Sequence, residues 1–163
     1  MHNCLVGSEM CIRDSPVTRG HENVVLRGLN LFDEVVVAVG QHSTKKGTFP
    51  VEERLEMLRE TFADQPRVKV MSYTGLTSEF CHQVGATAQL RGVRNSADFE
   101  YEKTIAQMTR QMHPDLDTVV LLTDPAFTAI HSTVVREVLG HGGDIRPFVP
   151  EALAARFPWN SAR

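Results

Sequence analysis

Residues Val35–Gly40 read Val-Val-Val-Ala-Val-Gly, an apolar run that ends at a glycine. A run of β-branched residues without polar alternation is typical of a parallel strand that is buried on both faces of its sheet. The stretch therefore predicts an interior strand of a parallel sheet.

Helical and strand patterns alternate on both sides of this run. Further strands are expected at residues 68–73, 88–90 and 118–123, and helices at 20–32, 50–62, 76–84, 96–112, 132–139 and 152–157. Alternation with short connections predicts an α/β fold, a Rossmann-like parallel five-stranded sheet with helices on both faces. In such sheets, ligands bind beyond the carboxyl ends of the strands, near a topological switch point.

Length, charge and cysteine usage limit the class of protein. A chain of 163 residues suits one domain, and a net charge near −3 argues against a nucleic-acid or membrane-surface binder. Cys4, Cys11 and Cys81 show neither metal-ligand spacing nor an even disulfide set, which favours a reducing compartment. The sequence shows no apolar run near the ~20 residues of a membrane span and no export signal, so we expect a cytoplasmic protein.

The tetrad Thr18-Arg19-Gly20-His21 lies where a helix is expected to begin. The first N–H groups of a helix lack intrahelical partners and bind anions, a glycine admits an oxyanion close to the backbone, and a histidine can donate an N–H group. The tetrad therefore indicates a phosphate site. A second stretch, Ile130–Arg136, repeats the arrangement, with Ser132 and Thr133 at another helix start.

Four segments together resemble one family of enzymes. They are Pro16–His21, with the pattern Pro-x-Thr-x-Gly-His; Thr44–Lys46 followed by Phe49 and Glu52–Arg54; Arg91–Glu102, the segment most particular to the family; and Ile130–Arg136, close to Ile-Ser-Ser-(Ser/Thr)-x-x-(Lys/Arg). In this order and spacing they are similar to the bacterial phosphopantetheine adenylyltransferases, nucleotidyltransferases marked by a (Thr/His)-x-Gly-His motif. The resemblance covers residues 16 to about 150.

The resemblance implies transfer of AMP from ATP to 4′-phosphopantetheine, giving dephospho-coenzyme A and pyrophosphate in coenzyme A synthesis. His21 would donate to the α-phosphate in the transition state, and Thr18 would fix the motif. Lys45 and Arg91 would hold the phosphate of the acceptor.

The resemblance also implies further contacts and partners. Leu76 and Thr77 would contact the pantetheine arm. Residues on the ATP side would be Gly20, His21, Gly92, Val93, Arg94, Glu102, Phe127, Thr128, Ala129, Ile130, His131, Ser132 and Thr133. Mg²⁺ would be held chiefly by ATP itself, without a metal site on the protein, and the chain would form a homohexamer that binds neither nucleic acid nor a membrane.

Each signal also has a structural interpretation. Thr18 is a typical helix N-cap. Arg91 and Arg94 have the helical spacing to pair with Asp98 or Glu102 and so to close a turn.

Residues 1–15 depart from the family pattern. Relatives carry a short apolar strand and a Pro-Gly-Thr-Phe-Asp turn before Pro16, where this chain has Cys11–Ser15, and Glu9 would fall inside the central strand. Burial of an unpaired carboxylate there is unfavourable. We therefore expect residues 1–15 to be a non-native segment, residues 16–163 to form a single nucleotidyltransferase domain, and the first, central strand to be the one that the sequence does not support.

Two smaller departures fall on the ATP side. His131 stands where the family has its first signature serine, and Ala129 replaces an aromatic residue. Both are expected to alter the contacts with ATP.

Two other functions stay open. Another nucleotidyltransferase, acting on nicotinate mononucleotide or of the cytidylyltransferase type, fits the phosphate motifs but not the segment Arg91–Glu102. An inactive nucleotide-binding subunit fits the loss of the first phosphate-binding turn.

Overall fold

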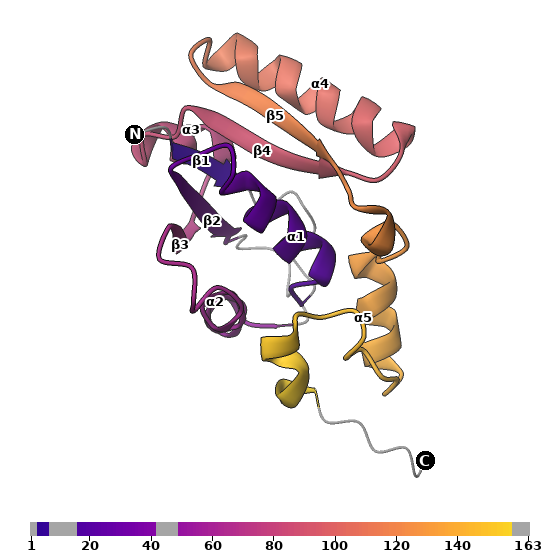
Figure 1. Cartoon of the computed structure of the whole chain (residues 1–163). Helices are drawn as coiled ribbons and strands as arrows, with labels where there is room; N and C mark the ends of the chain where they lie inside the picture. Colours follow the sequence, from indigo (N-terminus) through magenta and orange to yellow (C-terminus); the bar gives the residue numbers. More distant parts are fainter. Residues whose placement is uncertain (1–2, 7–15, 42–48, 158–163) are drawn as a thin grey trace.

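Five parallel strands form the sheet, in the order β3-β2-β1-β4-β5 (Figure 1). This computed structural model describes residues 3–6, 16–41 and 49–157. The strands are β1 (Asn3–Val6), β2 (Glu34–Gly40), β3 (Val68–Tyr73), β4 (Ala88–Val93) and β5 (Asp117–Leu122). Every neighbouring pair is parallel, which confirms the predicted α/β class.

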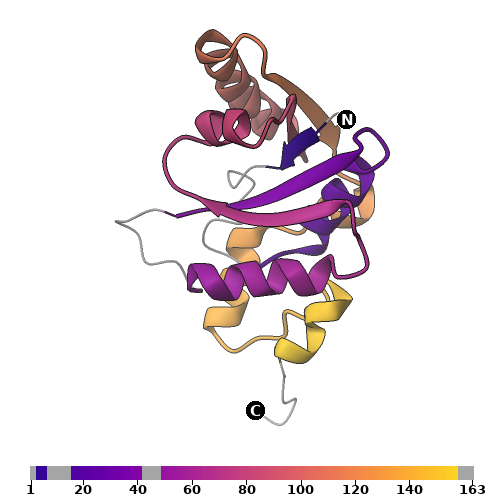
Figure 2. The same cartoon turned by 90° about the vertical axis from the view of Figure 1, so that its left-hand side faces the viewer.

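Helices lie on both faces of the sheet. They are α1 (Arg19–Gly28), α2 (Val51–Thr61), α3 (Thr77–Gln83), α4 (Ser96–Met112) and α5 (Ser132–Gly140), with 3₁₀ helices η1 (Pro125–Phe127) and η2 (Glu151–Arg156). Figure 2 shows α3 and α4 on one side of the sheet, and α2 with the C-terminal helices on the other. None of the helices in the described segments is long and apolar enough to cross a membrane.

The apolar run in β2 is buried on both of its faces, as predicted. Val35, Val37 and Val39 belong to the core that α1, α2 and the C-terminal segments cover. Val36 and Ala38 belong to a second core on the opposite face, which α3 covers. The alternation of a strand therefore places consecutive valines in two different cores, and both require apolar residues.

Three elements differ from the sequence prediction. Helix α1 ends at Gly28, four residues before the expected end at residue 32, because the chain continues there in tighter turns such as that from Leu31 N–H to the carbonyl of Gly28. β4 runs to Val93, three residues past its predicted end, because Arg91, Gly92 and Val93 pair in register with β5. The last helix, expected at residues 152–157, is a 3₁₀ helix at Glu151–Arg156. In β4, pairing with the neighbouring strand outweighs the weak strand propensity of an arginine and a glycine.

The central position of the sheet is filled by β1. Its backbone pairs with β2, where Leu5 is opposite Val36, and with β4, where Leu5 is opposite Gln89. The strand that the sequence did not support is therefore present at Asn3–Val6. Glu9, which was expected inside it, lies outside the described residues.

Removal of a core side chain from α2 tests the packing of this face. Leu58 is 0% exposed and Leu31 is 55% exposed. We expect Leu58→Ala to lower the free energy of unfolding by about 3 kcal/mol, because it leaves a cavity between α2 and the sheet. Leu31→Ala is the matched control and should change it by less than about 0.5 kcal/mol. Urea unfolding measures both, and equal losses would contradict this core assignment.

Candidate active site

A cavity of about 290 Å³ opens at the carboxyl end of the sheet, beside the starts of α1 and α5. It lies beyond the ends of β4 and β5. Helix α1 follows β1 and helix α4 follows β4, and from these neighbouring strands the chain passes to opposite faces of the sheet. This is the topological switch point at which open α/β sheets bind ligands. Its lining residues are Thr18, Gly20, His21, Val24, Gly92, Arg94, Ala97, Asp98, Tyr101, Glu102, Thr123, Phe127, Ile130 and Ser132.

The start of α1 is a capping box that fixes the His21 ring. Thr18 is the N-cap, and its Oγ1 accepts a hydrogen bond from the backbone N–H of His21. In return, the backbone N–H of Thr18 donates to His21 Nδ1 over 3.1 Å. Because Nδ1 accepts, the neutral imidazole carries its hydrogen on Nε2. The motif thus presents His21 to the cavity as a hydrogen-bond donor, and Thr18 is both N-cap and ring holder.

Most of the first backbone N–H groups of α1 already have partners. Arg19 N–H donates to the carbonyl of Phe148 over 2.9 Å, and His21 N–H is held by Thr18. Gly20 lines the cavity, and its N–H has no hydrogen-bond partner among the described residues. The start of α1 can therefore offer one backbone donor to an anion, fewer than the sequence suggested.

The start of α5 is open. His131 is its N-cap but makes no side-chain cap hydrogen bond, and the first turn contains no acidic residue. The N–H groups of Ser132, Thr133 and Val134 have no partner within the described part of the chain. Ser132 is buried and lines the cavity. Several aligned donors and the positive end of the helix dipole make this the stronger anion site of the two.

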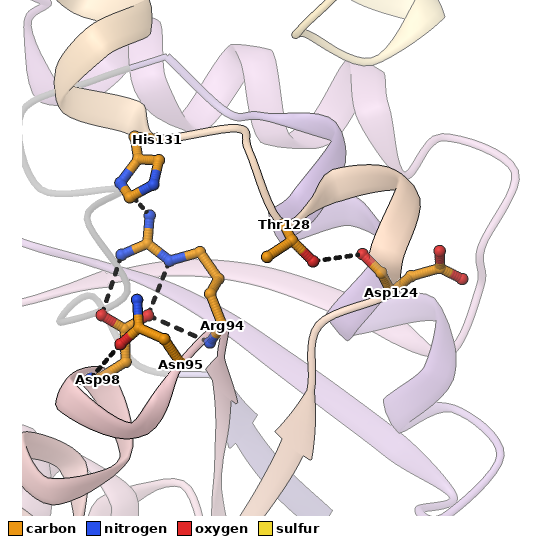
Figure 3. Close-up of polar contacts among 6 residues, drawn as sticks. All are labelled: Arg94, Asn95, Asp98, Asp124, Thr128 and His131. Atoms are coloured by element: carbon orange, nitrogen blue, oxygen red, sulfur yellow. Dashed lines mark hydrogen bonds and ion pairs between the residues drawn. The ribbon is translucent and has the colours of Figure 1, made fainter.

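Arg94, Asp98 and His131 form a polar cluster at the rim of the cavity (Figure 3). Arg94 Nε and Nη2 donate to the two Asp98 oxygens over 2.8 and 3.1 Å, and Arg94 Nη1 lies 2.6 Å from His131 Nδ1. The hydrogen bonds from Arg94 hold the pKa of the Asp98 carboxyl below its usual range, although partial burial opposes the shift. The predicted structural pairing of Arg94 with Asp98 is confirmed.

Arg91 lies beneath the cavity, within the fold. It is 1% exposed, its Nη2 donates to Gln89 Oε1 over 3.2 Å, and its Nε lies 3.5 Å from Glu102 Oε2. Gln89 in turn donates to Cys81 Sγ on α3. Glu102 also lines the cavity, so the buried ion pair links the sheet to the site. Burial without such partners would be prohibitive for a guanidinium.

The structure brings together many of the predicted site residues, but not all. The cavity is lined by Thr18, Gly20, His21, Gly92, Arg94, Glu102, Phe127, Ile130 and Ser132. Six other predicted residues are absent from the lining but are next to lining residues in the sequence: Arg91, Val93, Thr128, Ala129, His131 and Thr133. Leu76 and Thr77 lie at the start of α3, and Thr77 Oγ1 bonds the Tyr73 hydroxyl. Lys45 lies outside the described residues. The roles of all these residues stay predictions.

Sequence reasoning did not assign five residues that line the cavity. Ala97, Asp98 and Tyr101 share one face of α4 with Glu102. Ala97 is four residues before Tyr101 and Asp98 is four residues before Glu102, a spacing that could have revealed them. Val24 and Thr123 follow from α1 and the end of β5 only once the fold is known.

A protein metal site is not apparent in the described segments. No group of three or more His, Cys, Asp or Glu side chains could hold a metal ion there. The polar groups at the cavity are suited mainly to an anion.

Comparison with known proteins assigns the class and then the family. A family model described as Cytidylyltransferase-like matches residues 15–138, so the chain is a nucleotidyltransferase of this class. Phosphopantetheine adenylyltransferase of Bacteroides fragilis is 45% identical over 138 residues, which cover 85% of this chain and 91% of the relative. The enzyme of that name from Flavobacterium johnsoniae is 45% identical over 141 residues, 86% of this chain and 92% of the relative. The chain belongs to the phosphopantetheine adenylyltransferase family, as the sequence motifs indicated.

A solved structure supports the fold. The NadR protein in complex with NR superposes with a TM-score of 0.59 at 18% identity, covering 94% of this chain and 44% of that one.

The pairing of Arg94 with Asp98 predicts a pH dependence of stability. Because the folded-state pKa of Asp98 lies below its unfolded value, the contribution is full above the unfolded pKa and is lost as the pH falls through the folded pKa. Asp98→Asn should therefore lower the free energy of unfolding by about 1 kcal/mol near pH 7, and this gap should close in acid. Urea unfolding across this range measures it, with the exposed Asp115→Asn as control. A gap that does not change with pH would contradict the assignment.

Proposed function

We propose that the chain transfers AMP from ATP to 4′-phosphopantetheine, forming dephospho-coenzyme A and releasing pyrophosphate. The observation that carries this proposal is that one cavity joins the Nε2–H donor of His21 to the open start of α5. The relatives named phosphopantetheine adenylyltransferase support the choice of acceptor, because they match about nine tenths of their own length.

The chemistry needs positioned donors and no nucleophilic side chain. An oxygen of the acceptor phosphate attacks the α-phosphorus in line with the leaving pyrophosphate, and negative charge develops on the other oxygens. In our proposal, His21 donates through Nε2 to an α-phosphate oxygen. The N–H groups of Ser132 and Thr133, with the Ser132 hydroxyl, receive the β- and γ-phosphates. The N–H group of Gly20 is a further donor to the phosphates.

The acceptor side is proposed from the family resemblance. Lys45 and Arg91 would hold the phosphate of phosphopantetheine, and Leu76, which is 54% exposed, would contact its arm together with Thr77. The ion pair of Arg91 with Glu102 fixes the guanidinium before the acceptor arrives.

Three further properties are proposed on the same resemblance. Mg²⁺ accompanies ATP and is bound mainly by its phosphates, so it supplies charge neutralisation without a dedicated protein site. The chain acts in the cytoplasm as a homohexamer. Size-exclusion chromatography with light scattering tests the assembly, and a mass other than six times that of the chain would contradict it.

One assay tests the reaction. Pyrophosphate release is measured with ATP and 4′-phosphopantetheine, with ATP and nicotinate mononucleotide, and with ATP alone. We expect release only with phosphopantetheine. Because residues 1–15 lack the family turn, the assay is repeated on a variant that carries the family strand and Pro-Gly-Thr-Phe-Asp before Pro16. Release with nicotinate mononucleotide instead would assign a different acceptor, and none from either protein would identify an inactive nucleotide-binding subunit.

Substitution of His21 tests its role. We expect His21→Ala to lower kcat about 100- to 1,000-fold, because it removes a donor to the charge that develops in the transition state. The Kd for ATP, measured by calorimetry, should change less than about threefold, because the donors of α5 remain. His141→Ala, at the exposed far end of α5, is the control. A large loss of ATP affinity with unchanged kcat would make His21 a binding residue only.

A further inference from the structure

His131 occupies the N-cap of α5 but does not cap the helix. N-caps are usually Ser, Thr, Asp or Asn, whose side chains bond one of the first N–H groups. Here the imidazole turns to Arg94, and its Nδ1 lies 2.6 Å from Arg94 Nη1 (Figure 3). The first N–H groups of α5 are thereby left available to an anion, and the histidine serves a different partner.

The direction of this hydrogen bond defines the charge state of the ring. A guanidinium can only donate, so Nδ1 of His131 must accept and carries no hydrogen. The imidazole in this contact is therefore neutral, with its hydrogen on Nε2. Arg94 is held on its other edge by both oxygens of Asp98, so its guanidinium is fixed on two sides.

We propose that neutral His131 is a positioning residue for Arg94: it holds the guanidinium at the cavity rim, beside the open start of α5, in readiness for the polyphosphate of ATP. This inference rests on the proposed function for the identity of the anion. Arg94 and Asp98 line the cavity, whereas His131 is adjacent to Ser132, which does. His131 thus acts through Arg94 and not by direct contact with the reacting atoms.

The charged groups that face His131 favour a neutral ring in this contact. They are Arg94 at 2.6 Å and, behind it, the Asp98 carboxylate, both from the junction of β4 and α4. The first turn of α5 adds no charged residue. A proton on Nδ1 would remove the acceptor and set two cations against each other, so acid should weaken the contact. If His131 bound phosphate directly as a cation, ATP affinity would rise in acid.

Two substitutions of His131 distinguish the loss of the hydrogen-bond acceptor for Arg94 from the gain of a positive charge on the ring. His131→Gln keeps an acceptor oxygen within reach of Arg94, carries no ionisable group and is not among the usual N-caps, whereas His131→Ala removes the acceptor. The control is His141→Gln, at the far end of the same helix. Calorimetry with ATP on the full chain, at about pH 8 and about pH 5.5, compares the variants under alkaline and acidic conditions.

The expected results follow from one hydrogen bond. Near pH 8, His131→Ala should weaken ATP binding about fivefold, and His131→Gln should stay within about twofold of the parent protein. On acidification, the parent should lose about fivefold more affinity than His131→Gln. Every other ionisable group, ATP included, is common to both proteins, so the difference isolates His131. The KM for 4′-phosphopantetheine should be the same in all variants.

Other outcomes overturn the proposal. Equal losses in His131→Gln and His131→Ala, parallel pH profiles of the parent and His131→Gln, or affinity that rises in acid would each do so, as would failure of the chain to bind ATP. If the ATP affinities change as expected but no pyrophosphate is released from ATP in the presence of 4′-phosphopantetheine, the proposed function fails and the role of His131 stands.

Discussion

Backbone pairing of β1 with β2 on one side and with β4 on the other joins the two halves of the sheet. Among the described strands, no other pair connects β2 and β3 to β4 and β5. The segment that follows β1 supplies Thr18 and His21, and the end of β4 supplies Gly92 and Arg94. The strand that joins the two halves of the sheet, and with them the two sides of the cavity, therefore spans only four residues, Asn3–Val6.

In the proposed function, the two helix starts at this cavity contribute differently to the binding of an anion. At α1 the capping box of Thr18 and His21 satisfies the backbone and fixes the tautomer of the ring, so this end gives geometric precision. At α5 the N-cap side chain leaves the first turn unsatisfied, so this end gives electrostatic attraction. A capping serine or threonine at position 131 could compete with an anion for the same N–H groups. The histidine, turned to Arg94, does not.

The sequence was sufficient for the layers of the fold and for part of the site. The apolar run Val35–Gly40 predicted an interior strand, and the segment Ser96–Met112 was expected to be a long helix; both elements are present. It was insufficient where the deciding partner is distant in the chain. The extension of β4 depends on register with β5, and the occupation of the first N–H of α1 depends on the carbonyl of Phe148. The contact between His131 and Arg94 spans 37 positions, so no local pattern could indicate it.

Helix α4 also controls the charge of the site. Asp98 and Glu102 lie one turn apart, and each is paired with an arginine from the end of β4, Arg94 and Arg91 respectively. These pairs cancel much of the positive charge that the arginines would otherwise present, in a chain whose net charge is already −3. In the proposed function, the backbone N–H groups and the helix dipole of α5 add an attraction for a polyphosphate that does not depend on pH. The arginines contribute fixed donor geometry, because paired carboxylates hold their guanidinium planes before any ligand arrives.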